Sequence, residues 1–192
     1  MVPVRDVRSD LRAALRSGPD PRAATGDRLA AVLAPLVELP EPALVFTRRA
    51  ADLSRHPGEI SFPGGLQDPG EMLVETALRE CREEIDLDPA AVEVVGALSP
   101  VHVRVSRILV VPFVGMVASP PALTHSVGEI DEVLTFPVRR LATAESAMEL
   151  ARDDGRTWKG WAYEVDGTLI WGATGAMLHD LLEVLRKETT WL

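Results

Sequence analysis

A loop rich in glycine and proline that runs into an amphipathic helix is the feature that most constrains this chain. The loop covers residues 54–70 and contains Phe62-Pro63-Gly64-Gly65. From about Met72 to Ile85, apolar residues recur at i, i+4, i+7 and i+11, which is helical spacing. These residues form one stripe, made of Val74, Leu78, Cys81 and Ile85. Because such a stripe must be buried, we expect this side of the helix to face the core.

Three glutamates, Glu80, Glu83 and Glu84, gather on another face of the same helix. At i, i+3 and i+4 their Cβ atoms lie about 5–6 Å apart, and like charges at this spacing destabilise a helix unless a cation compensates them. Oxygen ligands without histidine or cysteine nearby select Mg2+ or Mn2+ over zinc, and such a site favours phosphoryl chemistry. The alternative is an ordinary solvated face, partly neutralised by Arg79 and Arg82. The two glycines of the loop, which permit close backbone approach, favour the metal site.

The remaining pattern mixes strands with helices. Helices are predicted at 5–17 and 173–187, strands at 28–39, 43–47, 92–98, 108–117 and 133–136, a polar or helical connection at 139–151, and a hairpin of 161–165 with 168–171 around Asp166-Gly167. This mixture predicts an α/β or α+β sandwich. We expect a helical arm over residues 1–25 and one main domain over residues 26–192.

Composition and charge exclude several classes of protein. The chain is 46% hydrophobic and 26% charged, which is typical of a globular domain rather than a disordered one. Its net charge of −9 argues against a nucleic-acid partner. The longest apolar runs are about ten residues, half of what a membrane span needs, and no apolar signal core opens the sequence. With a single cysteine, Cys81, these features predict a cytoplasmic protein.

The loop and helix together resemble a known signature. Gly65, five residues, Glu71, seven residues and then Arg79-Glu80-Cys81-Arg82-Glu83-Glu84-Ile85-Asp86-Leu87 is similar to the Nudix box, G-x5-E-x7-R-E-U-x-E-E-x-G-U, where U is bulky and aliphatic. Asp86 replaces the second glycine of the box, and Cys81 stands at a position that is usually aliphatic. Asp tolerates the left-handed conformation better than most residues, so we expect a shifted helix cap and an intact site.

Segments outside the box resemble the Nudix branch that hydrolyses coenzyme A. Upstream these are residues 46–50 and the run from Leu53 to Gly65, and downstream they are 111–115, 129–133 and 170–174. The resemblance implies an α/β/α sandwich around a mixed sheet. It also implies metal-dependent hydrolysis of the pyrophosphate of CoA or its acyl or oxidised derivatives to 3′,5′-ADP and (acyl-)4′-phosphopantetheine.

The resemblance assigns roles to individual residues. Mg2+ or Mn2+ would be held by Glu80, Glu83 and Glu84. Glu71 and Arg79 would form an ion pair that braces the joint between loop and helix, with Gly65 as the third structural residue of the box. Substrate phosphates would meet Arg49, Arg55 and His56, against the backbone of Gly64 and Gly65. The general base stays open, and the catalytic candidates are Glu80, Glu83, Glu129 and Glu132.

Two further functions remain open at this stage. One is a Nudix hydrolase of another nucleoside diphosphate derivative, such as ADP-ribose, NADH or a dinucleoside polyphosphate. The other is a nucleotide-sensing module without turnover, although such modules typically lose box carboxylates. The N-terminal helix, with Val7, Leu11 and Leu15 on one face, suits packing on its own domain or on a second subunit, and we expect a homodimer.

Overall fold

The structure, a computed structural model, describes most of the 192-residue chain. The described residues are 7–15, 27–52, 57–103, 106–118, 122–126, 128–151 and 157–192. Among them, no helix is long and apolar enough to cross a membrane.

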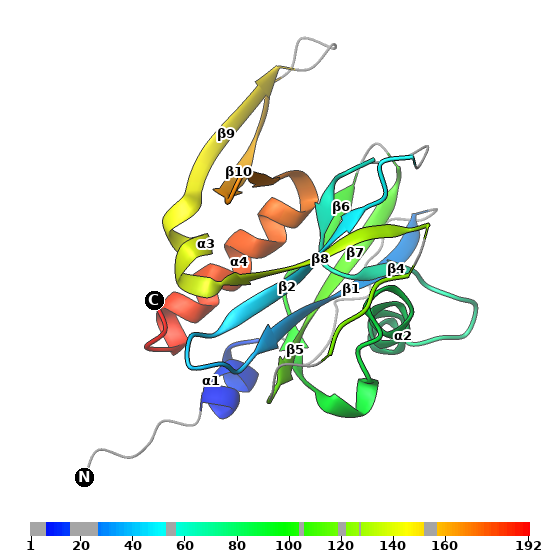
Figure 1. The fold of residues 1–192 in the computed structure, drawn as a ribbon, viewed down its shortest axis with the longest axis horizontal. Coiled ribbons are helices and arrows are strands. Elements are labelled where there is room, and N and C mark those ends of the chain that lie inside the picture. Colours follow the sequence, from blue (N-terminus) through cyan, green and yellow to red (C-terminus); the bar gives the residue numbers. More distant parts are fainter. Residues whose placement is uncertain are drawn as a thin grey trace.

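An eight-stranded mixed sheet forms the centre of the molecule (Figure 1). Its strands are β1 (Arg28–Val37), β2 (Ala43–Arg49), β3 (Ile60–Ser61), β4 (Gly64–Leu66), β5 (Val92–Ala97), β6 (Val101–Val103), β7 (Ile108–Val117) and β8 (Ile130–Pro137). The main path runs β3-β2-β1-β7-β5, while β4 pairs with β1, β6 with β7 and β8 with β2. β1 and β7 are parallel along their full lengths and the other pairs are antiparallel. The mixed sheet predicted from the sequence is therefore confirmed.

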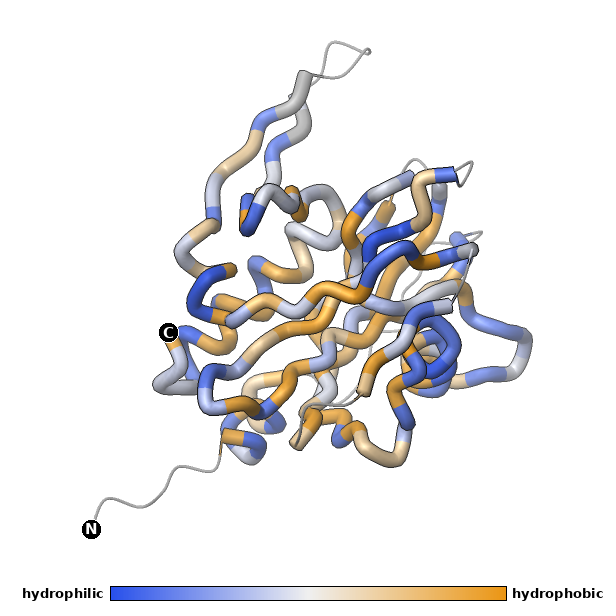
Figure 2. The backbone as a smooth tube through the Cα atoms, viewed as in Figure 1, coloured by the Kyte–Doolittle hydropathy of each residue, from blue (hydrophilic) through white to orange (hydrophobic). Residues whose placement is uncertain are grey.

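Helices cover both faces of this sheet. α2 (Leu73–Ile85) packs on one face, where Ala77, Cys81 and Ile85 join a buried cluster with Leu33 of β1 and Phe113 of β7. α4 (Gly172–Glu188) packs on the other face with Leu178, Leu181, Leu182 and Leu185. The apolar segments in Figure 2 follow the strands between these helices. Of the predicted stripe on α2, Cys81 and Ile85 are fully buried, whereas Val74 and Leu78 are only partly so.

The N-terminal helix packs on its own domain. α1 (Val7–Ala14) lies against α4 and β5, and Leu11 and Leu15 are buried in the same cluster as the apolar side of α4. Arg8 forms ion pairs with Glu38 and Glu93, and Arg12 also pairs with Glu93. The apolar face of α1 is thus buried against its own domain, which is one of the two arrangements that the sequence left open for this helix.

A second, three-stranded sheet lies beside α4. It contains β9 (Glu145–Ala151), β10 (Thr157–Val165) and β11 (Thr168–Ile170) in the order β11-β10-β9, and α3 (Val138–Ala144) leads into it. The hairpin at Asp166-Gly167 is confirmed, with positive φ of 52° and 74° at the two turn residues. The interpretation of 139–151 as a connection was incomplete, because its second half is β9, paired along its length with β10.

Short pieces of structure were also missed in the sequence. The loop over 54–70 contains β3 and β4, and β6 precedes β7 as a three-residue strand. A 3-10 turn, η1 (Pro89–Ala91), follows α2. Strands of two or three residues carry too little sequence to show a period, and they exist here because a longer neighbour supplies the partner edge.

Candidate functional site

The joint between β4 and α2 fixes two of the predicted glutamates against the sheet. β4 pairs with β1 so that Gly64 lies opposite Val32 and Gly65 opposite Ala31. The Gly64 N–H donates a hydrogen bond to Glu84 Oε2 at 3.2 Å. A Cβ on Gly65 would lie 2.5 Å from Glu80 Cδ, so the Glu80 carboxyl group occupies the space that a side chain there would take. Gly65 therefore lets the strand approach the acidic face of α2 closely, and the Gly64 N–H binds the buried carboxylate of that face.

The negative charges of the carboxyl groups on this face are only partly offset by nearby cations. Glu84 is only 6% exposed, and burial is the main cause that raises its pKa to about 7, against the hydrogen bond from Gly64. The charges of Glu80 and Glu129 raise it further, and that of Arg49 lowers it. Burial also raises the pKa of Glu80. A buried carboxylate beside further carboxylates is stabilised by a nearby cation, so the metal site expected at this face stays a prediction that suits its electrostatics.

Arg79 organises the other side of the same face. Its guanidinium binds Glu71 through two hydrogen bonds, of 2.9 and 3.2 Å, and it also donates to Glu80 Oε1 at 2.9 Å and Glu83 Oε2 at 3.1 Å. The hydrogen bonds from Arg79 and then Thr76 hold the pKa of Glu71 at about 2. This ion pair links the loop to α2, so the structure brings Glu71 and Arg79 together.

Thr76 completes this arrangement, and it was missed in the sequence. Its hydroxyl donates to Glu71 Oε2 at 2.7 Å, and the residue is fully buried. Gln67 adds a hydrogen bond of 2.6 Å to the Glu71 carbonyl. A threonine among the polar residues of the helix gives no sign of its partner, because Glu71 lies before the helix begins.

The side chains of two neighbouring arginines of β2 lie on opposite faces of the sheet. Arg49 interacts electrostatically with Glu84, and its Nε is buried without a hydrogen-bond partner among the described residues. Arg48 instead bonds Glu132 at 3.0 Å and Thr168 at 3.1 Å. Successive side chains of a strand point to opposite faces, which separates the two arginines. Arg49 therefore belongs with the acidic face of α2, and Arg48 with the second sheet.

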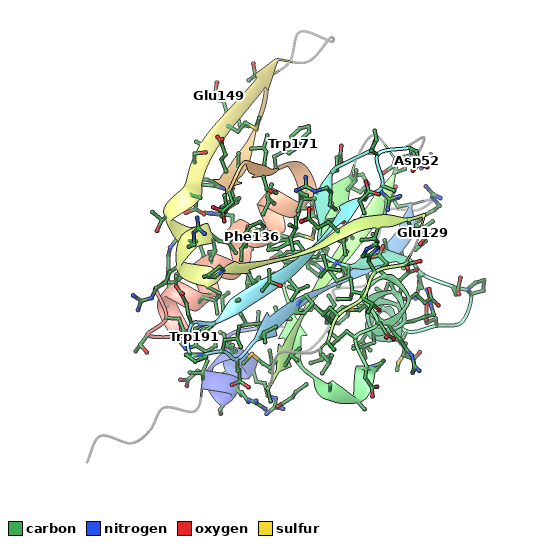
Figure 3. The ribbon with its side chains drawn as sticks, in the orientation of Figure 1. Asp52, Glu129, Phe136, Glu149, Trp171 and Trp191 are labelled. Carbon is green, nitrogen blue, oxygen red and sulfur yellow. The ribbon has the colours of Figure 1, made fainter. Side chains whose placement is uncertain are left out.

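The two candidate general bases outside the box, Glu129 and Glu132, also lie in different surroundings. Glu129 is exposed and close enough to Glu80 and Glu84 to affect the pKa of each. Figure 3 labels Glu129 just before β8, on the side of the molecule where α2 lies. Glu132 is held by Arg48, so the structure does not bring it to the acidic face. Arg55 and His56 lie outside the described residues.

The acidic face fits a divalent cation by its chemistry. Within the described parts of the chain, no group of three side chains stands arranged as a ready metal site. Arg79 bonds Glu80 and Glu83 on one side, and the Glu83 side chain is 59% exposed. All the groups available are oxygen donors, and Glu84 adds a buried carboxylate, so Glu80, Glu83 and Glu84 suit Mg2+ or Mn2+.

Asp86 ends α2 at the position of the missing box glycine. The helix runs to Ile85, and Asp86 adopts the left-handed conformation with φ 55° and ψ 29° while its N–H bonds the Arg82 carbonyl. The expected shift of the cap was therefore wrong, because Asp supports the same backbone geometry that glycine would.

A protein-family model described as the NUDIX domain matches residues 27–158, more than half of the chain. The chain belongs to the Nudix family. Relatives named "Uncharacterized Nudix hydrolase NudL" from Pectobacterium atrosepticum and Cronobacter sakazakii are 34% and 37% identical to it. The first alignment covers 87% of this chain and 88% of the relative, and the second covers 83% and 84%.

Solved Nudix structures share the fold. The NUDIX domain of Shewanella oneidensis NrtR, whose structure contains ADP ribose, matches with a TM-score of 0.56 at 16% identity, over 88% of this chain and 92% of that one. RenU, a Nudix hydrolase from M. smegmatis, matches with a TM-score of 0.52 at 20% identity, over 60% and 74%. The family model and the NudL relatives, rather than these structures, show that the protein is a Nudix hydrolase, a pyrophosphohydrolase of a family that generally uses divalent metals such as Mg2+ or Mn2+.

Proposed function

We propose that this Nudix hydrolase cleaves the pyrophosphate of coenzyme A or its acyl or oxidised derivatives. The products would be 3′,5′-ADP and (acyl-)4′-phosphopantetheine. The observation that carries the proposal is the position of Arg49, within the upstream segment that resembles the CoA-hydrolysing branch. Its Nε is buried and has no hydrogen-bond partner within the part of the chain that the structure describes, and the residue lies beside the acidic face of α2. A guanidinium there suits a substrate phosphate, which it can bind through two parallel hydrogen bonds.

Glu80, Glu83 and Glu84 would hold Mg2+ or Mn2+. When bound, such a metal polarises the pyrophosphate and makes a bound water nucleophilic. The residues of the chain prepare this chemistry in separate ways. The Gly64 N–H orients Glu84, and Arg79 holds the Glu80 carboxyl group in place at 2.9 Å.

Of the two candidate general bases outside the box, Glu129 is better placed than Glu132. Glu129 is exposed and near the acidic face, so it can accept a proton from an attacking water without losing an ion pair. Glu132 would first have to leave Arg48. Glu80 and Glu83 remain alternatives, because both carboxyl groups lie on the same face of α2.

The substrate assignment is tested by a product assay on the purified chain with Mg2+ or Mn2+. The panel contains CoA, acetyl-CoA, ADP-ribose, NADH and diadenosine polyphosphates, with products identified by mass spectrometry. We expect CoA or acetyl-CoA to be cleaved at least about tenfold faster than the others, a difference of about 1.4 kcal/mol in the barrier. Faster cleavage of another nucleotide would contradict the CoA assignment while leaving the Nudix chemistry in place.

Replacing Arg49 should weaken the binding of this substrate. We expect Arg49→Ala to raise the KM for CoA roughly tenfold or more, since a charge-assisted phosphate contact contributes about 1.5–3 kcal/mol. Arg48→Ala is the matched control, because the neighbouring guanidinium bonds Glu132 and Thr168 on the opposite face. Steady-state kinetics on both variants checks this, and an equal effect of the two changes would contradict the assignment of Arg49.

A further inference from the structure

The outer edge of β9 is open. β9 ends the order β11-β10-β9, so one side of its backbone pairs with β10 and no strand of the described chain pairs with the other. Figure 1 shows β9 and β10 extending away from the main sheet. Figure 3 labels Glu149 on β9, well away from Glu129 at the acidic face. An edge of seven residues presents a row of free N–H and C=O groups to a further strand.

This edge lacks the features that normally protect an open strand. Exposed edges are usually blocked by lysine, proline or unpaired charges, and residues 145–151 contain no lysine, arginine or proline. Its two acids are both paired within the same chain. Glu149 bonds Lys159 of β10 at 2.5 Å, and Glu145 has three partners of its own. Lys159 and Arg186 therefore offset part of the negative charge that β9 would present to a second strand.

The base of β9 is held firmly. Glu145 accepts hydrogen bonds from Tyr163 at 2.7 Å, His179 at 2.8 Å and Arg186 at 2.7 Å, which joins β9 to β10 and α4. The His179 ring stacks on Trp161 of β10 at 4.0 Å between centroids. Because the strand leaves the body of the molecule in a fixed direction, little conformational entropy is lost when its edge is paired.

We propose that the β9 edge pairs with β9 of a second copy of this chain, antiparallel and around a two-fold axis at Met148. A two-fold interface must be self-complementary, and this register fulfils that condition. It places Met148 opposite Met148 and Ala147 opposite Glu149, so that the two Glu149 side chains do not face each other. The other surface considered for a dimer, the apolar face of α1, is buried in the chain's own core.

The register predicts opposite effects for two substitutions of the exposed Ala147. Ala147→Glu would place like charges opposite Glu149 twice in the dimer, and we expect it to raise the dimer dissociation constant roughly tenfold. Ala147→Lys would place opposite charges there and should lower the constant severalfold. Sedimentation velocity over a concentration series measures both, and thermal melts show that each variant is folded. A monomer at every concentration, or the same shift for both variants, would overturn the proposal.

A cross-linking experiment tests the position of the axis. Opposed residues of antiparallel strands have Cα atoms about 4.5–5.5 Å apart, within the range of a disulfide. We expect Met148→Cys to form a covalent dimer under mild oxidation, since Cys81 is buried. Leu169→Cys, at an exposed position of β11, is the control and should cross-link far more slowly. Equal rates would overturn the assigned interface. Neither readout depends on hydrolysis, so the outcome is independent of the proposed substrate.

Discussion

Glu84→Gln is expected to lower turnover by at least about a hundredfold, or about 2.7 kcal/mol in transition-state stabilisation. The amide keeps the shape of the side chain but removes one of the charges proposed to hold the metal. Stability should not fall with activity. Burial raises the pKa of Glu84 to about 7, so a neutral group at this position avoids a desolvation cost that the carboxylate carries. We therefore expect a melting temperature equal to or above that of the unchanged protein.

Turnover with saturating Mn2+, a metal-binding titration and a thermal melt together test this expectation. Glu183→Gln is a suitable control, because it makes the same chemical change on α4, where Glu183 pairs with Arg186 and Lys187. A rate for Glu84→Gln near that of the unchanged protein would contradict the ligand assignment. A large loss of stability would instead show that the Glu84 charge supports the fold.

Local patterns were sufficient for the elements that carry the fold. The helix over 73–85 follows from a period and the hairpin at Asp166-Gly167 from a turn. The strands β1, β2, β5 and β7 follow from short apolar runs, and Pro35 favours a strand over a helix for β1. β9 could not be found in this way, because residues 139–151 join a helix to a strand without a break in composition. That strand exists because β10 offers it a partner across the chain.

The candidate site likewise contains some contacts that the sequence could predict and others that it could not. Glu71 lies before α2 begins, so its contact with Arg79 could be anticipated from the resemblance to the Nudix box and not from helical spacing. The separation of Glu129 from Glu132 depends on how β8 pairs with β2. Arg49 lies opposite Ile130 while Arg48 lies opposite Glu132, with a register shift between them. A one-residue change of register exchanges the two faces of a strand, and sequence alone does not fix it.

Gly64→Ala should show how closely the fold and the site depend on each other. A Cβ at Gly64 would lie 2.5 Å from Val32 Cα and would also meet the Ala31 carbonyl oxygen, both of them backbone atoms of β1. A central strand cannot move aside as a side chain can, so β4 must shift away from β1. We expect a loss of roughly 2–4 kcal/mol in the free energy of unfolding, or about 5–15 °C in melting temperature.

Gly65→Ala separates this packing effect from an effect on the acidic face. The Cβ there would meet the Glu80 carboxyl group, the far end of a side chain that can turn. We therefore expect less than about 1 kcal/mol of lost stability, but a loss of turnover, because Glu80 leaves its place beside Arg79. Denaturant melts and rates on the two variants test the contrast. If Gly65→Ala is the less stable variant, the close approach of β4 to β1 is not what requires glycine at position 64.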